Sequence, residues 1–308
     1  MSDVELSGDQ ESMGGVVAPA SPVGQPTIAG LPDGYVYGVT RYSDVLLQGA
    51  FPDRLADLVR SLESFRPTLD ELRAGGGGRT VFVGRFDQSL ADQRAPDGTQ
   101  VWGKRNITVY RGVGLDDTPE PLVRTRGHEI DMFGVGGRSS PFPGIAVEME
   151  WNNKDPFFDR DLVNYDALHR EGAIAVGVIV TRGPRLQDVI GPVIRSKDGG
   201  YKFGQSSTHW NKLVPRVNLG GGGECPLLLI GIEPERIDGI ELAYEARALV
   251  KQAVRATDKA TWRDHYATHA DAKAAAMRFR RAAEDLMPGL RDDDAPAPRV
   301  HVPVSSPT

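Results

Sequence analysis

The feature that most constrains the fold is an uninterrupted apolar run, AIAVGVIVT, at residues 173–181. The run lies between Gly172 and Arg182 and is too short for a membrane span, which needs about 20 apolar residues. A continuous run of this length is typical of a strand that is buried on both faces. It therefore predicts a sheet in the middle of the domain, with covering layers on either side.

The elements expected around this strand follow from hydrophobic periodicity. Strands are expected at Tyr35–Leu47, Thr80–Phe86, Ile107–Tyr110, His128–Val135, Gly144–Trp151 and Pro226–Ile232. Helices are expected from Pro52 to about Arg73 with a break at Pro67, from Pro156 to about Glu171, and over Gly239–Met287. Strands and helices in this order predict an α/β fold with a central mixed β-sheet flanked by helices.

The two ends of the chain differ in composition from its middle. Residues 1–32 are rich in Gly, Pro, Ser and Val, and residues 291–308 read RDDDAPAPRVHVPVSSPT, so both segments are expected to be disordered. Residues 33–290 contain no fixed-period repeat and no long linker, which predicts a single domain. The only cysteine is Cys225, which excludes an intramolecular disulfide framework, and no basic-then-apolar leader begins the sequence. A cytoplasmic location is therefore expected.

The charge balance limits the classes of nucleic-acid-binding protein to consider. The 308 residues include 36 Lys and Arg against 42 Asp and Glu, a net charge of −6. A protein that coats nucleic acid without sequence preference needs a broadly basic surface, so this class is disfavoured. A local basic cleft within an acidic protein remains compatible with the composition.

Two pairs of acidic residues alternate along two consecutive predicted strands. Glu148 and Glu150 are two residues apart, as are Glu129 and Asp131, so each pair leaves one face of its strand. The stretch between Asp131 and Glu148 is rich in Gly, Ser and Pro, which lets the strands become neighbours and brings these two carboxylates together. Such a group of oxygen donors suits a hard divalent cation, most simply Mg²⁺. The alternative is an edge strand whose polar face lies in water.

Two longer segments carry a resemblance to a known family. GIAVEMEWNNKDPFFDRDLVNYDALHREGAIAVGVIVTRG and SSTHWNKLVPRVNLGGGGECP resemble the BglII/BstYI group of type II restriction endonucleases, which share the PD-(D/E)xK nuclease core. The usual signature of that core is an acid, a spacer and then acid-x-lysine, and one branch replaces the lysine with Glu. Asp131 followed by Glu148-x-Glu150 resembles that Glu form, whereas the amino-terminal third of the chain matches only in outline.

The resemblance implies a restriction-endonuclease-like fold, duplex DNA as the substrate, Mg²⁺ as the cofactor and a homodimer acting on a palindrome with a GATC-type core. Asp131 and Glu148 would then be the metal ligands, and Glu150 would orient or deprotonate the attacking water. Asn153 falls where relatives touch a base edge, although a helix N-cap is an alternative for it. The remaining candidates are Lys154, Arg160, Ser207, Thr208 and His209 for DNA contacts and Glu129 for an outer-sphere contact to the metal.

Other functions fit parts of the same pattern. A repair or phage nuclease with structure preference would keep the same core, and a non-catalytic DNA-binding module would retain the acidic residues without cleavage. A glycosidase built on paired carboxylates fits less well, because only Trp151 is near and it is expected on the opposite face of the strand.

Overall fold

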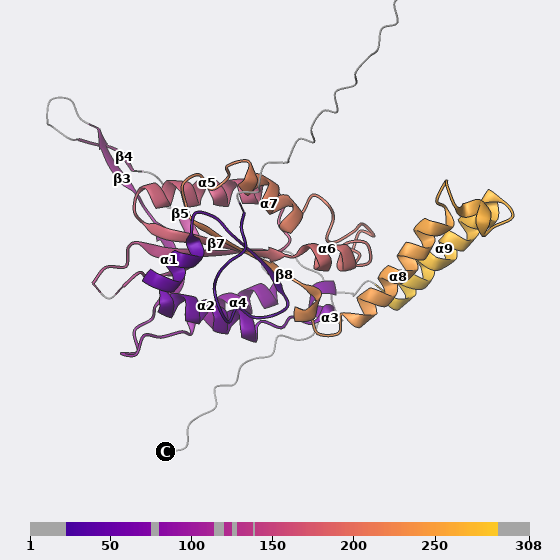
Figure 1. The fold of residues 1–308 in the computed structure, drawn as a ribbon, viewed down its shortest axis with the longest axis horizontal. Helices are drawn as coiled ribbons and strands as arrows, with labels where there is room; N and C mark the ends of the chain where they lie inside the picture. Colours follow the sequence, from indigo (N-terminus) through magenta and orange to yellow (C-terminus); the bar gives the residue numbers. More distant parts are fainter. Residues whose placement is uncertain (1–22, 75–79, 114–119, 125–127, 138, 289–308) are drawn as a thin grey trace, which may run out of the picture.

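The computed structural model describes residues 23–74, 80–113, 120–124, 128–137 and 139–288. A six-stranded sheet in the order β1-β8-β7-β6-β5-β2 forms its centre (Figure 1). These strands are β1 (Tyr35–Val39), β2 (Trp102–Ile107), β5 (His128–Gly134), β6 (Gly144–Glu150), β7 (Ile174–Arg182) and β8 (Leu227–Ile232). β6, β7 and β8 are parallel, and the other strands join antiparallel. The expected α/β fold with a central mixed sheet is confirmed.

Helices cover both faces of the sheet (Figure 1). One face packs against α1 (Ser43–Ala50), α2 (Pro52–Ser64), α3 (Leu69–Arg73) and α4 (Val81–Ala91), and the other against α5 (Phe157–Arg170) and α7 (Trp210–Asn218). β7 is buried from Val176 to Arg182, as the continuous apolar run predicts. α6 (Pro184–Ile190) begins directly after β7, at the end of the sheet where the parallel strands terminate.

Three expected strands differ from the structure. The one expected over Ile107–Tyr110 is not a strand, because β2 ends at Ile107 and the next strand begins only at Tyr110. Residues 81–91 form helix α4 where a strand was expected over Thr80–Phe86, because Phe82, Phe86 and Leu90 share one helical face that is buried in the core. Local β-branched and aromatic composition favoured a strand, but tertiary burial of this face decides the conformation. The strand expected over Tyr35–Leu47 ends at Val39, and α1 starts at Ser43.

The described part of the chain begins within the segment expected to be a disordered leader. Gly24 and Val39 exchange two backbone hydrogen bonds of 2.8 and 2.9 Å, Ile28 is buried, and Thr27 donates to the Asp44 carboxylate. Residues 23–32 therefore belong to the folded domain. Most of the expected leader, residues 1–22, and the expected tail, residues 291–308, lie outside the described residues.

Two hairpins extend from the central layers (Figure 1). β3 (Tyr110–Val113) pairs with β4 (Glu120–Arg124), and α8 (Glu241–Ala256) packs along α9 (His269–Leu286). Short 3₁₀ turns occupy Pro234–Arg236 and Trp262–Asp264. Within the described ranges, no helix is long and apolar enough to cross a lipid bilayer.

Candidate active site

Glu148 and Glu150 lie in the middle of the sheet rather than at its edge. β6 pairs with β5 on one side and β7 on the other, and both glutamates are buried, at 6% and 3% exposure. Their neighbours Val147 and Met149 belong to the opposite core, so the two carboxylates point together towards α5. The alternative of an exposed edge strand is therefore wrong.

Asp131 lies beside Glu148, because β5 runs antiparallel to β6. The backbone N–H of Asp131 donates to Glu148 Oε1 at 3.1 Å, and the two carboxyl groups are within hydrogen-bonding reach. Glu129, two residues earlier on β5, is exposed and forms an ion pair with Lys104 at 2.7 Å. The structure thus brings Asp131, Glu148 and Glu150 into one place, and it leaves Glu129 engaged at the surface.

A fourth carboxylate, Asp161, comes from α5 and was not among the candidates drawn from the sequence. It is 3% exposed and lies next to Glu150. Arg160 contacts both groups, with Nη2 at 2.7 Å from Asp161 Oδ1 and 3.4 Å from Glu150 Oε1. The signal in the sequence was an acid in the apolar repeat of a helix, between Phe158 and Leu162.

Crowding and burial make these acids hard to ionise. Burial raises the pKa of Glu148 well above its usual range, and the charges of Asp131 and Asp161 raise it further. Burial likewise raises the pKa of Glu150 to about 8, with the charge of Asp161 acting in the same direction. Burial also raises the pKa of Asp161, against the lowering effect of Arg160. Additional positive charge at this point would favour the ionised carboxylates.

The donor set fits a hard divalent cation. All four side chains offer oxygen, and Asp161 Oδ2 is buried without a hydrogen-bond partner among the described residues, an unusual state that a cation or a water would relieve. Within the same residues, no three such groups enclose an ion by themselves. Mg²⁺ is commonly held by one or two carboxylates together with waters and substrate phosphates, so the pair Asp131 and Glu148 is a sufficient protein contribution.

The two segments that carry the family resemblance lie against each other at this end of the sheet. Asp155 N donates to Ser206 O at 3.0 Å, and Thr208 N donates to Asn153 O at 2.9 Å. The Asn153 carboxamide donates to Glu150 Oε2 at 2.6 Å, so it is tied to the carboxylate cluster. No side chain caps α5, whose N-cap is Pro156, and the capping role considered for Asn153 is therefore not observed.

Arg182 holds the second of these segments in place. It is completely buried, its Nη2 donates to Ser207 Oγ at 2.7 Å and to Thr208 O at 2.6 Å, and its guanidinium lies over the Phe203 ring. Burial lowers the pKa of Arg182 to about 9. Arg182 is therefore an internal support for this segment.

The remaining DNA-contact candidates differ in their exposure. Asn153, Lys154 and Arg160 are exposed, and Ser207 is partly exposed. Thr208 and His209 are buried, at 0% and 1% exposure, so they lack the surface that a DNA contact at this site requires. The prediction that Thr208 and His209 contact DNA beside the carboxylate cluster is therefore wrong.

A family model described as restriction endonuclease BglII/BglIII matches residues 35–232, which include the whole central sheet and every carboxylate of the cluster. None of the curated proteins matches the chain significantly.

Proposed function

Because this chain belongs to the BglII/BglIII family of restriction endonucleases, we propose that it is a type II enzyme that cuts both strands of duplex DNA at a specific sequence in a Mg²⁺-dependent reaction. The observation that carries this proposal is the buried group of carboxylates at the end of the parallel strands, with Asn153, Lys154 and Arg160 exposed beside it. A buried acidic group with raised pKa values is costly for a fold, and its presence is typical of a functional site.

The residues divide the chemistry between them. Asp131 and Glu148 would hold Mg²⁺, which supplies charge stabilisation at the phosphate and lowers the pKa of a bound water. Glu150 accepts the proton of the attacking water, in the ionised form that a cation at Asp131 and Glu148 would favour. Water oxygen bonds to phosphorus as the bond to the leaving nucleotide breaks. Asn153 and Arg160 hold the Glu150 carboxylate in position through Nδ2 and Nη2.

The exposed residues around the cluster are suited to bind the DNA. Lys154 and Arg160 offer positive charge to backbone phosphates, and Asn153 presents a carboxamide that can pair with a base edge. Ser207 lies opposite Lys154 in a backbone bridge, so the second segment continues this surface. Glu129 would act only through Lys104 or as an outer-sphere contact.

The symmetry of the expected DNA sequence predicts how many subunits bind it. A palindrome, which by resemblance to the family has a GATC-type core, presents the same sequence on both strands, so a homodimer with one active site per subunit matches it. We place the enzyme in the cytoplasm, where it would meet DNA.

Digestion of plasmid and phage DNA tests the proposal. With Mg²⁺ the chain should give discrete fragments whose sequenced ends share one palindrome, and Glu148→Ala should give no fragments while retaining DNA binding. A smear would indicate a structure-selective nuclease instead. Absence of metal-dependent cleavage on every DNA would leave only a DNA-binding module.

A further inference from the structure

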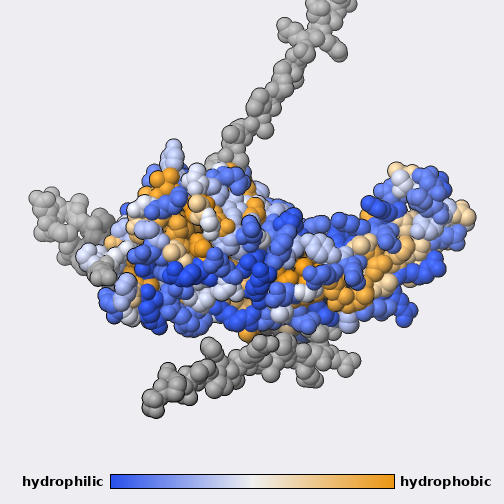
Figure 2. Space-filling model, turned by 60° about the horizontal axis from the view of Figure 1, so that its bottom comes forward, coloured by the Kyte–Doolittle hydropathy of each residue, from blue (hydrophilic) through white to orange (hydrophobic). Residues whose placement is uncertain are grey.

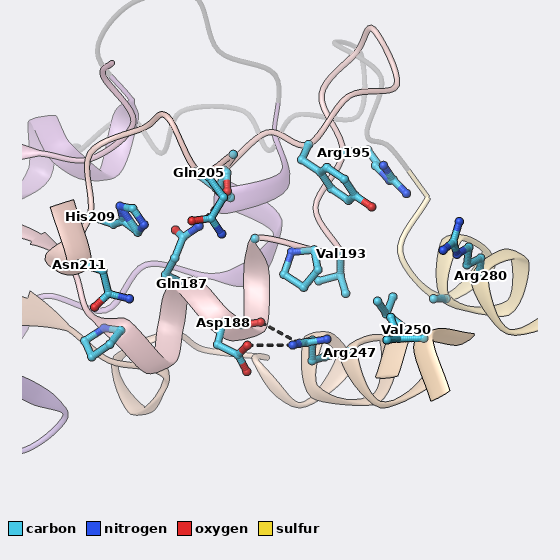
Figure 3. A pocket seen from close by; sticks show the side chains of 18 of the residues that line it. Gln187, Asp188, Val193, Arg195, Gln205, His209, Asn211, Arg247, Val250 and Arg280 are labelled. Atoms are coloured by element: carbon cyan, nitrogen blue, oxygen red, sulfur yellow. Dashed lines mark hydrogen bonds and ion pairs between the residues drawn. The ribbon is translucent and has the colours of Figure 1, made fainter. Parts of the chain in front are cut away.

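A second cleft lies away from the carboxylate cluster, between α6, residues 191–211 and the α8–α9 hairpin (Figure 3). Its volume is about 500 Å³, within the range that small-molecule sites occupy. None of the four clustered carboxylates lines it. One wall comes from α8 and α9, which lie beyond the residues that match the family, so family membership assigns the cleft no role.

Two buried polar atoms on the wall of this cleft form no hydrogen bond with any residue that the structure describes. The Gln187 amide donates from Nε2 to Phe203 O at 2.9 Å, but its Oε1 is buried without a hydrogen bond from any described residue. His209 Nδ1 is in the same condition, and both residues line the cleft. Unpaired buried polar atoms are rare in folded proteins, so two of them at one cleft indicate a bound polar molecule.

The opposite side of the cleft is rich in arginine (Figure 3). Arg247 is held by Asp188 on α6 at 2.8 Å. Arg195 lies over the Tyr201 ring and reaches Glu284 at 3.4 Å. Arg280 makes no ion pair with any residue in the described ranges, so the cleft keeps an uncompensated positive charge. The planar guanidinium group is well suited to phosphate oxygens.

The cleft also has an apolar wall. Val193, Val250 and Val254 line it, and Figure 2 shows apolar surface that runs from the body along the hairpin. The apolar wall, the Gln187 amide acceptor and the Arg280 guanidinium together match the three parts of a nucleotide. The sugar and the base face would take the apolar wall, a base amino group would reach Gln187, and the phosphate would reach Arg280 and Arg195.

We propose that this cleft is a nucleotide-binding site, distinct from the active site, in which Arg280 and Arg195 hold a phosphate. The nucleotide has two sources, namely a strand of the DNA substrate outside the cleavage site or a free nucleotide. The first source rests on the proposed function. It is favoured by position, since Gly204, Gln205 and His209 line the cleft, and the intervening Thr208 donates its backbone N–H to Asn153 O at the carboxylate cluster.

The test compares two arginines of the same helix. Arg280 lines the cleft, whereas Arg278, two residues earlier, is exposed and does not line it. Arg280→Ala and Arg278→Ala are each made in the full chain carrying Glu148→Ala, and binding is measured without divalent metal, so cleavage plays no part. The probes are the four deoxynucleoside monophosphates, followed by calorimetry, and a fluorescein-labelled 30-base-pair duplex, followed by anisotropy.

The proposal expects Arg280→Ala to weaken binding of at least one probe by about tenfold, the usual effect of losing a hydrogen bond to a charged group, and Arg278→Ala to change it less than twofold. An effect on the duplex alone identifies the DNA strand as the source, and an effect on the monophosphates alone identifies a free nucleotide. Equal effects of the two variants, no effect of either, or no binding of any probe would overturn the proposal. A chain that binds nucleotides here yet never cuts DNA would overturn only the proposed function.

Discussion

At the scale of single residues, the unusual feature is the burial of Glu148, Glu150 and Asp161 in one place beside Asp131. Arg160, whose side chain is half exposed, forms ion pairs with Glu150 and Asp161. In a low-dielectric environment the acids relieve their repulsion by holding protons. A divalent ion relieves it differently, because it favours the ionised form of each ligand, and this is the state that hydrolysis requires.

The least expected member of the cluster, Asp161, can be tested by Asp161→Asn, which keeps its size and removes its charge. We expect Mg²⁺-dependent cleavage to fall by about 10- to 100-fold, the usual effect of losing a residue that supports a metal site. The rise in melting temperature on adding Ca²⁺ should also shrink. Asp159→Asn is the matched control, since Asp159 is exposed on the same helix and pairs with Arg216. Full activity with an unchanged response to Ca²⁺ would contradict a role for Asp161.

The burial of His209 predicts a pH dependence of stability. Burial lowers the pKa of its imidazole to about 4, while the unfolded chain keeps the ordinary value near 6.5. Between these values only the unfolded chain takes up the proton, so the free energy of unfolding should fall as pH drops from about 6.5 to about 4, by at most about 1.4 kcal/mol per pH unit. Urea unfolding of wild type and His209→Gln at pH 7.5, 6 and 5 measures this. Parallel pH profiles for the two proteins would show that His209 does not titrate in this way.

At the scale of elements, the sequence best predicted those features that depend on a local hydrophobic period. Strict alternation in β6 correctly placed Glu148 and Glu150 together on one face, because the pleat of a strand fixes side-chain direction. Asp161 was missed because no spacing within α5 reveals that this helix lies over β6.

Other elements depend on contacts that sequence periodicity does not contain. Residues 81–91 form a helix because Phe82 and Phe86 then pack against Phe65, the residue that directly follows α2. Arg182 points inward because its guanidinium donates to the backbone carbonyl of Thr208 and lies over the Phe203 ring. Neither residue is near Arg182 in the sequence. The DNA contacts assigned to Asn153, Lys154, Arg160 and Ser207 remain predictions.

The inward position of Arg182 gives a prediction for the segment it supports. Arg182→Met removes the hydrogen bonds to Ser207 and Thr208, so residues 204–209 should exchange their amide hydrogens faster and DNA binding should weaken. The free energy of unfolding should fall by about 2–4 kcal/mol, since buried carbonyl and hydroxyl groups lose their donor. Arg170→Met is the control, because Arg170 is exposed in its ion pair with Asp166 on the same helix and should contribute less than about 1 kcal/mol. Exchange that rises evenly over the whole chain would argue against a local support.

At the scale of the whole molecule, charge is unevenly distributed. Residues 241–288 contain nine Lys and Arg against seven Asp and Glu, a net charge of +2. The whole chain has a net charge of −6, so the remaining residues together carry −8. The more basic part is the hairpin, which projects from the same end of the sheet at which the parallel strands terminate (Figure 1). An acidic body with a basic extension there would keep DNA near the carboxylate cluster while the rest of the surface repels it, and its affinity should fall steeply with salt.

The proposed homodimer predicts that cleavage of both DNA strands needs two active sites, one in each subunit. If each subunit cuts one strand, a mixed dimer of wild type and Glu148→Ala should convert supercoiled plasmid to nicked circles and stop there. Co-expression with two different affinity tags isolates the mixed species, whose mass should be twice 33.4 kDa. Wild-type dimers, prepared in the same way, should give linear DNA. Linear product from the mixed dimer, or full activity from a 33.4 kDa monomer, would mean that one active site cuts both strands and that symmetry does not govern recognition.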